Sequence, residues 1–120
     1  MLTGIDVKET KPFTSSQDEG ESKTTFHIGN LSNRQKIDLI GDLMDQQGKV
    51  DSRKIQEKAI DIFLMGVRRI ENFFDPVKKQ AVNVHEITEG IADMVPFLIV
   101  CEVAGKIVEW NFVGEDERKN

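Results

Sequence analysis

The sequence predicts an α+β fold that is mainly helical, with three principal helices and a small N-terminal β hairpin or edge-strand pair. Apolar residues recur at helical spacing along most of the chain after residue 32, whereas residues 5–8 and 24–29 alternate with the period of a strand. A length of 120 residues is near the commonest size of one domain. The expected divisions are an extended polar arm (1–23), a single small, mainly helical domain (24–114) and a charged tail (115–120).

The first 23 residues are mostly polar, and their few apolar side chains cannot offset the entropy of ordering the segment. We therefore expect an arm that a partner orders. Ile5 and Val7 alternate with polar neighbours, and residues 24–29 repeat this alternation after a turn at residues 19–21. A two-stranded ribbon is marginal alone, so it must pack on helices or add to the sheet of a neighbour.

The first helix is expected from Asn33 to Gln47. Ser32 and Gln35 have the spacing of a capping box, in which each side chain satisfies a backbone N–H of the other residue. Gly48 supplies the left-handed residue that often ends a helix. The apolar residues of the segment are expected to form one stripe: Ile37, Ile40, Leu43 and Met44.

The second helix is expected to begin at Asp51 or Ser52 and to end before Pro76, because proline disfavours a helical conformation of the preceding residue. This segment has the strongest helical periodicity in the chain. Its expected apolar face comprises Ile55, Ala59, Ile62, Phe63, Gly66, Val67, Ile70 and Phe74. Beyond it, residues 81–84 can be extended and residues 86–93 can form a short helical turn.

Pro96 can begin a third helix, where its missing N–H costs nothing, and Gly114 can end it. A hairpin competes with this interpretation, because residues 97–103 and 107–113 are rich in β-branched and aromatic residues. Helix is the prediction. The core is then expected to comprise Ile62, Phe63, Val67, Ile70, Val100, Ala104 and Ile107.

Composition argues against several classes of partner. A net charge of −5 repels a phosphate backbone, so nucleic-acid binding is not expected. The longest apolar run, residues 94–101, is far too short to span a bilayer, and residues 1–8 lack the pattern of a signal peptide. The single cysteine, Cys101, cannot form an internal disulfide and fits a reducing compartment.

No catalytic residue, cofactor site or metal site is expected. His27 and His85 lack partners at metal-ligand spacing. Cys101 follows four apolar residues, a setting that raises the pKa of a thiol and makes it inert. Gln17 and Ser22 stand where a phosphate-binding loop ending in Lys23 and Thr24 needs its two glycines. We therefore expect a protein that is not an enzyme and has no small-molecule substrate.

Seven residues are candidates for contact with a partner protein. The pair Arg68 and Arg69 suits an acidic neighbour, although a solvated helix end is the simpler explanation. Aromatic residues near the ends of helices either complete the core or anchor a contact between subunits. The apolar arm residues can add a strand to a partner sheet or pack back on their own helices. The candidates are Ile5, Val7, Phe13, Arg68, Arg69, Phe73 and Trp110.

Four features in this order support a resemblance to a group of proteins. They are the arm through residues 10–13, the segment 25–31 that leads into a capped helix, the strong second helix through residues 66–73 and the charged end 115–120. This order resembles small proteins encoded among the morphogenesis genes of tailed bacteriophages and prophages. Such proteins are loosely labelled tail assembly chaperones or minor structural proteins.

The resemblance implies a non-enzymatic structural or assembly protein of a bacteriophage virion. Its expected partners are other phage structural proteins of the head, neck or tail, bound through the arm and the helical body. It further implies several copies in a symmetric assembly, built in the cytoplasm of the bacterial host. Two alternatives are a soluble tail assembly chaperone absent from the mature particle and a bacterial protein-binding adaptor domain.

Overall fold

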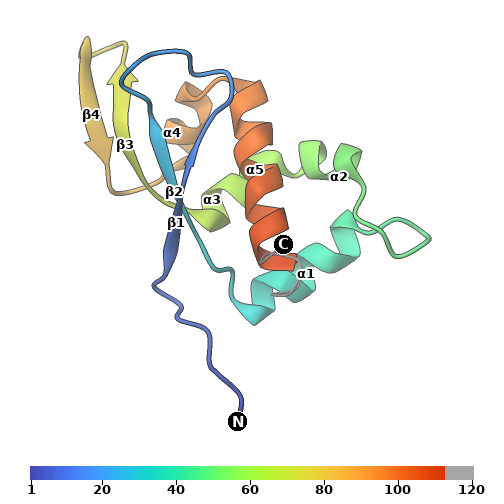
Figure 1. Cartoon of the computed structure of the whole chain (residues 1–120). Helices are drawn as coiled ribbons and strands as arrows, with labels where there is room; N and C mark the ends of the chain where they lie inside the picture. Colours follow the sequence, from blue (N-terminus) through green and yellow to red (C-terminus); the bar gives the residue numbers. More distant parts are fainter. Residues whose placement is uncertain (113–120) are drawn as a thin grey trace.

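A four-stranded antiparallel sheet lies on one side of the molecule, and the helices gather on the other (Figure 1). The computed structural model describes residues 1–112, so the expected closing Gly114 and the charged tail 115–120 lie outside the described residues. The elements in chain order are β1 (Thr10–Thr14), β2 (Thr25–Gly29), α1 (Asn33–Leu43), α2 (Ser52–Glu57), α3 (Ala59–Gly66), β3 (Val67–Asp75), β4 (Gln80–Val84), α4 (Glu89–Met94) and α5 (Phe97–Phe112).

The α+β class is confirmed, but the expected small N-terminal hairpin is only half of the sheet. The strands follow the order β1-β2-β3-β4, so β1 and β4 are the two edges. Strand 24–29 is confirmed as β2, whereas the strand expected at 5–8 is wrong. Asp6 accepts a hydrogen bond on Oδ1 from the backbone N–H of Lys8 and one on its carbonyl from Glu9, which makes a turn there. The strand starts at Thr10 instead.

The prediction that one helix continues to residue 74 is wrong, because the helical segment ends at Gly66 and strand β3 follows directly. Two register shifts of β3, one against β2 and one against β4, each add an extra residue to β3. Val67, Ile70 and Phe73 all face the core, at intervals of three residues instead of two. Apolar residues three positions apart also mark one face of a helix, so the bulged strand has the apolar spacing that is typical of a helix.

The second bulge contains Asn72, which has a φ of 57°, a left-handed conformation that asparagine tolerates better than most residues. Its backbone N–H donates to Oδ1 of Asn83 at 2.9 Å, and its carbonyl accepts from the hydroxyl of Thr24 at 2.8 Å. These bonds replace the ladder bonds that the bulge removes.

Helix α1 begins as expected, because both hydrogen bonds of the capping box between Ser32 and Gln35 are present. It ends at Leu43, four residues before the expected end, because Met44 is extended and forms a β-bridge with Val50. The expected apolar stripe is also wrong in part. Leu39 and Leu43 are buried, whereas Ile37 and Ile40 are exposed.

Helix α5 confirms the helical prediction for the last apolar segment and passes through the centre of the molecule (Figure 1). It packs against α3 and across the inner face of β2. All seven residues expected in the core are buried, and the Phe63 ring meets Phe26 of β2 edge-on, with 6.0 Å between the ring centroids. Sequence periodicity therefore identified the core even where it assigned the wrong element.

Replacing Gly66 with alanine is expected to destabilise the fold by about 1–3 kcal/mol, because an ideal Cβ would lie 2.6 Å from two carbons of Ile107. The Ile107 side chain is fully buried and β-branched, so it cannot move aside cheaply. Urea denaturation measures the free energy of unfolding. Gly105→Ala is the control, since its Cβ meets nothing within 4 Å and alanine should stabilise helix α5. Equal stability of the two variants would contradict the close α3–α5 packing.

Candidate partner-binding surfaces

The N-terminal segment projects from the body, and Asn30 fixes its base (Figure 1). Asn30 Nδ2 donates to the carbonyl of Asp6 at 2.9 Å, and its Oδ1 accepts from Trp110 Nε1 at 2.9 Å. Its backbone carbonyl accepts from Arg68 Nη2 at 2.6 Å. The structure thus brings two predicted partner-binding residues, Arg68 and Trp110, to the base of the N-terminal segment, where each bonds within its own chain.

On the core side of Asn30, the buried side chain of Asn111 forms hydrogen bonds with the connection between β2 and α1. Its side-chain Oδ1 accepts from the N–H of Leu31 at 2.7 Å, and its Nδ2 donates to the carbonyls of Gly29 and Ile107. Sequence reasoning missed this residue. The available signal was its position four residues after Ile107 in the buried stripe of the third helix, where a polar side chain needs a partner.

Residues 1–9 form the part of the expected arm that remains exposed, and we call them the projecting segment. Ile5 is 62% exposed and Val7 is 72% exposed, and Met1 and Leu2 are also fully open to solvent. The first five residues carry no charged side chain. The projecting segment therefore offers four exposed apolar side chains that its own chain leaves uncovered.

Residues 10–23 are instead tied to the body, so the expected arm of residues 1–23 is shorter in the structure. Residues 10–14 pair with β2 as an edge strand, in which Pro12 is tolerated and Phe13 is half-buried against the core. The loop that follows is held by Glu102 of α5, whose Oε2 accepts from the hydroxyl of Ser16 at 2.6 Å. Lys11 Nζ lies 5.0 Å from the centre of the Trp110 ring, a cation–π contact that also links β1 to α5.

Two other predicted residues lie on strand β3. Arg69 points to the outer face of the sheet, where its Nη1 lies 3.2 Å from Oε1 of Glu71. His27 Nε2 lies 2.8 Å from the same oxygen, although the angles are poor for a hydrogen bond. Phe73, expected at a subunit contact, is buried in the core, and its neighbour Phe74 is 60% exposed instead. A strand sends adjacent residues to opposite faces, which decides between the two rings.

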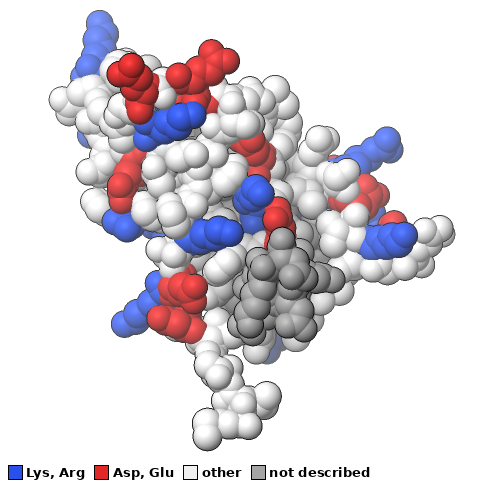
Figure 2. Space-filling view, in the orientation of Figure 1, with Lys and Arg blue, Asp and Glu red and all other residues white. Residues whose placement is uncertain are grey.

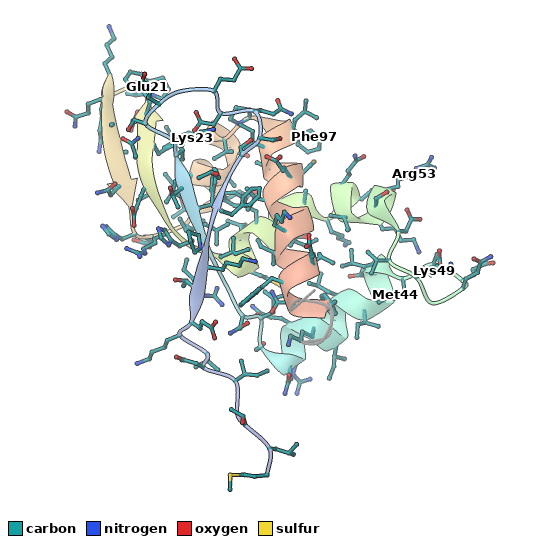
Figure 3. All side chains as sticks on the ribbon, viewed as in Figure 1. Glu21, Lys23, Met44, Lys49, Arg53 and Phe97 are labelled. Atoms are coloured by element: carbon teal, nitrogen blue, oxygen red, sulfur yellow. The ribbon has the colours of Figure 1, made fainter. Side chains whose placement is uncertain are left out.

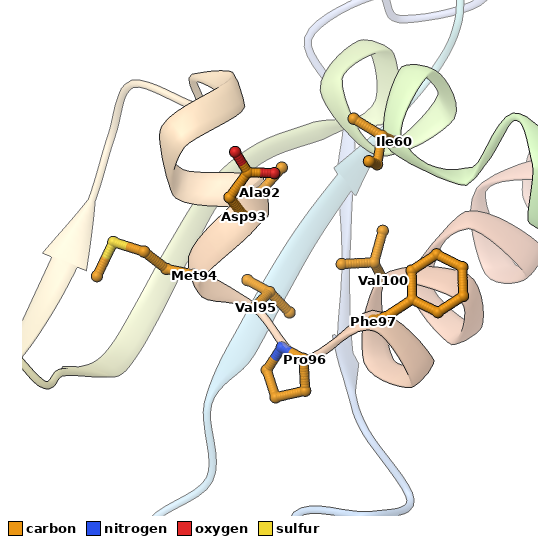
Figure 4. A pocket seen from close by; sticks show the side chains of 8 residues that line it. All are labelled: Ile60, Ala92, Asp93, Met94, Val95, Pro96, Phe97 and Val100. Carbon is orange, nitrogen blue, oxygen red and sulfur yellow. The ribbon is translucent and has the colours of Figure 1, made fainter.

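An apolar pocket of about 300 Å³ opens between α3, α4 and the start of α5 (Figure 4). The exposed Phe97 ring stands at its rim, at the beginning of α5 (Figures 3 and 4). Asp93 is the one ionisable residue of its lining, which otherwise contains Ile60, Ala92, Met94, Val95, Pro96, Phe97 and Val100. Such a lining suits an apolar side chain of a partner better than a polar substrate.

Within residues 1–112, no group of three or more potential metal-ligating side chains is found, and no helix is long and apolar enough to cross a membrane. Burial raises the pKa of the Cys101 thiol, as the sequence predicted. Basic and acidic side chains are interspersed on the face that Figure 2 shows.

Comparison of the chain with protein-family models, curated proteins and solved structures gives no match.

Asn111→Ala is expected to lower the free energy of unfolding by about 1–3 kcal/mol, because the buried N–H of Leu31 then loses its acceptor. Chemical denaturation monitored by circular dichroism measures the change. Asn33→Ala, at the exposed start of α1, is the matched control and should change stability little. An Asn111 variant as stable as the control would show that the junction does not depend on this amide.

The carboxyl group of Glu102 should make stability depend on pH. Burial raises its pKa, but hydrogen bonds from Ser15 and Ser16 and the charge of Lys106 outweigh burial, so the pKa lies below its ordinary value of 4.5. A lowered pKa in the folded state stabilises the fold above the ordinary value and loses this contribution as pH falls through the folded value.

Glu102→Gln should therefore be less stable than the parent chain at neutral pH, and the difference should shrink as pH falls below 4.5. Urea denaturation from about pH 7 to about pH 3 measures both chains. A constant difference across this range would mean that the bond to Ser16 does not depend on the charge of Glu102.

Proposed function

We propose that this chain is a non-enzymatic protein-binding subunit and that the projecting segment is its binding element. The exposure of Ile5 and Val7, two apolar side chains that their own chain leaves uncovered, is the observation that carries the proposal. Burying one such side chain against a partner contributes about 1.5–3 kcal/mol. Residues 1–5, which precede the turn at Asp6, can add a strand to a partner sheet, in which backbone bonds supply affinity and alternate side chains supply specificity.

The fixed base of the segment supports this role. The bond from Asn30 to the carbonyl of Asp6 holds the chain at the point where it leaves the body. Only the few residues before this point must then be ordered when a partner binds, which limits the entropic cost of binding. A segment of five residues extends about 17 Å, enough to reach across part of a neighbouring subunit.

The biological setting that we propose is the morphogenesis of a tailed bacteriophage. In this setting the chain is a structural or assembly component of the virion that binds a head, neck or tail protein in several copies. The resemblance of its sequence features to small phage morphogenesis proteins supports this setting, and the projecting segment supplies the contact.

A soluble tail assembly chaperone is the second candidate. The observation that favours it is the apolar pocket together with Phe97 and Leu98, two adjacent exposed residues at the start of α5. An exposed apolar patch of this kind can cover an aggregation-prone surface of another protein before assembly.

The test compares the full chain with a variant that lacks residues 1–5 and carries Val7→Ser. The free energy of unfolding should change by no more than about 0.5 kcal/mol, because these side chains contact solvent. Incorporation should be lost, as measured by mass spectrometry of purified phage particles. The matched control is Ile37→Ser with Ile40→Ser, which removes two exposed β-branched side chains from α1.

Each outcome separates the candidates. Presence of the full chain in particles and absence of the variant support the virion role and the binding segment. Absence of the full chain from particles, with reduced particle yield for the variant, supports the chaperone. Normal incorporation of the variant, or a large loss of its stability, contradicts the projecting segment as the binding element.

A further inference from the structure

The two edges of the sheet differ in how they are protected against pairing with another strand. Edge strand β1 contains Lys11 and Pro12, a charge and a residue without an N–H, which are devices that keep foreign strands away. Edge strand β4 has the sequence Gln-Ala-Val-Asn-Val, with no charged residue, no proline and no glycine. It is also the outermost element on its side of the molecule (Figure 1). Strand β4 is thus an unprotected edge.

The side chains of β4 are incompletely covered by their own chain. Val82 and Val84 pair with Phe73 and Ile70 on the core side of the sheet, yet both valines stay only half-buried. Their β3 partners, in contrast, are buried. A further strand beside β4 would extend the sheet and cover the open side of these two valines.

The ends of β4 carry opposite charges. Lys78 and Lys79 precede the strand and Glu86 follows it, and all three are exposed. The side chains of Lys78 and Glu86 make no ion pair within residues 1–112, where the ion pairs involve other residues. If two β4 strands run antiparallel, the basic end of each lies against the acidic end of the other.

We propose that β4 is a self-association surface, on which a second copy of this chain pairs β4 with β4 in antiparallel orientation. A two-fold axis at Val82, the central residue of the strand, places Gln80 opposite Val84 of the partner subunit and brings the turn that contains Lys78 toward the bend that contains Glu86 of the partner subunit. This charge pair occurs twice because the contact is symmetric. A parallel pairing would instead set the lysines of the two copies side by side, which is unfavourable.

This surface is independent of the proposed binding segment, because the segment leaves the sheet at β1, on the opposite edge. The pairing of two five-residue strands buries a small area, so we expect monomers and dimers in equilibrium. The contact does not lead to larger oligomers, because the β4 edge of each copy is occupied by the β4 edge of the other.

Sedimentation velocity of the full chain over a concentration series tests the proposal. The parent chain should shift from monomer to dimer as concentration rises. Lys78→Glu and Glu86→Lys should each weaken dimerisation about tenfold, because each sets like charges opposite one another at two places. The double variant, which exchanges the charges, should restore dimerisation. Lys49→Glu, in the loop far from β4, is the control and should dimerise like the parent (Figure 3).

Circular dichroism and melting temperature establish that each variant is folded, as expected for changes of exposed side chains. A chain that stays monomeric at every concentration overturns the proposal. Dimers that are indifferent to both single charge reversals, or a double variant as weak as the single variants, overturn it as well. None of these results depends on the partner of the projecting segment.

Discussion

The amide of Asn111 is the polar contact on which the arrangement of the rest depends. One buried side chain on α5 bonds the backbone on both sides of Asn30, at Gly29 and Leu31. The sheet, the first helix and the last helix are thereby joined at one point. A buried amide with all its partners in place fixes a unique geometry, since any displacement leaves a backbone group unsatisfied in the core.

The junction also explains where the exposed surfaces lie. Because Asn111 bonds the connection between β2 and α1 from the core side, the side chain of Asn30 can bond Trp110 and the carbonyl of Asp6. Arg68 adds a third hydrogen bond, which it donates to the backbone carbonyl of Asn30. The projecting segment therefore leaves the body at a site that α5, β3 and the β2–α1 connection hold together, and its Asp6 carbonyl bonds to Asn30 there.

The bulged strand β3 separates the two kinds of contact that we propose. It lies between the strand pair that carries the N-terminal segment and the edge strand β4, and its extra residues keep Val67, Ile70 and Phe73 in the core. A hetero-contact at one edge and a two-fold contact at the other can then coexist on one small chain. Protein assemblies combine a two-fold contact, which closes on a pair of subunits, with a contact to a different partner, because the two surfaces form independently.

The sequence alone determined those features that arise from neighbouring residues or from the spacing of apolar ones. These are the capping box at Ser32, strand β2, helix α5 and the burial of seven core residues on α3, β3 and α5. The exposure of Ile5 and Val7 also follows from a segment too polar to fold by itself. Tertiary structure decided strand β3, the junction at Asn30 and the free edge of β4, because bulges and long-range hydrogen bonds leave no local signal in a sequence.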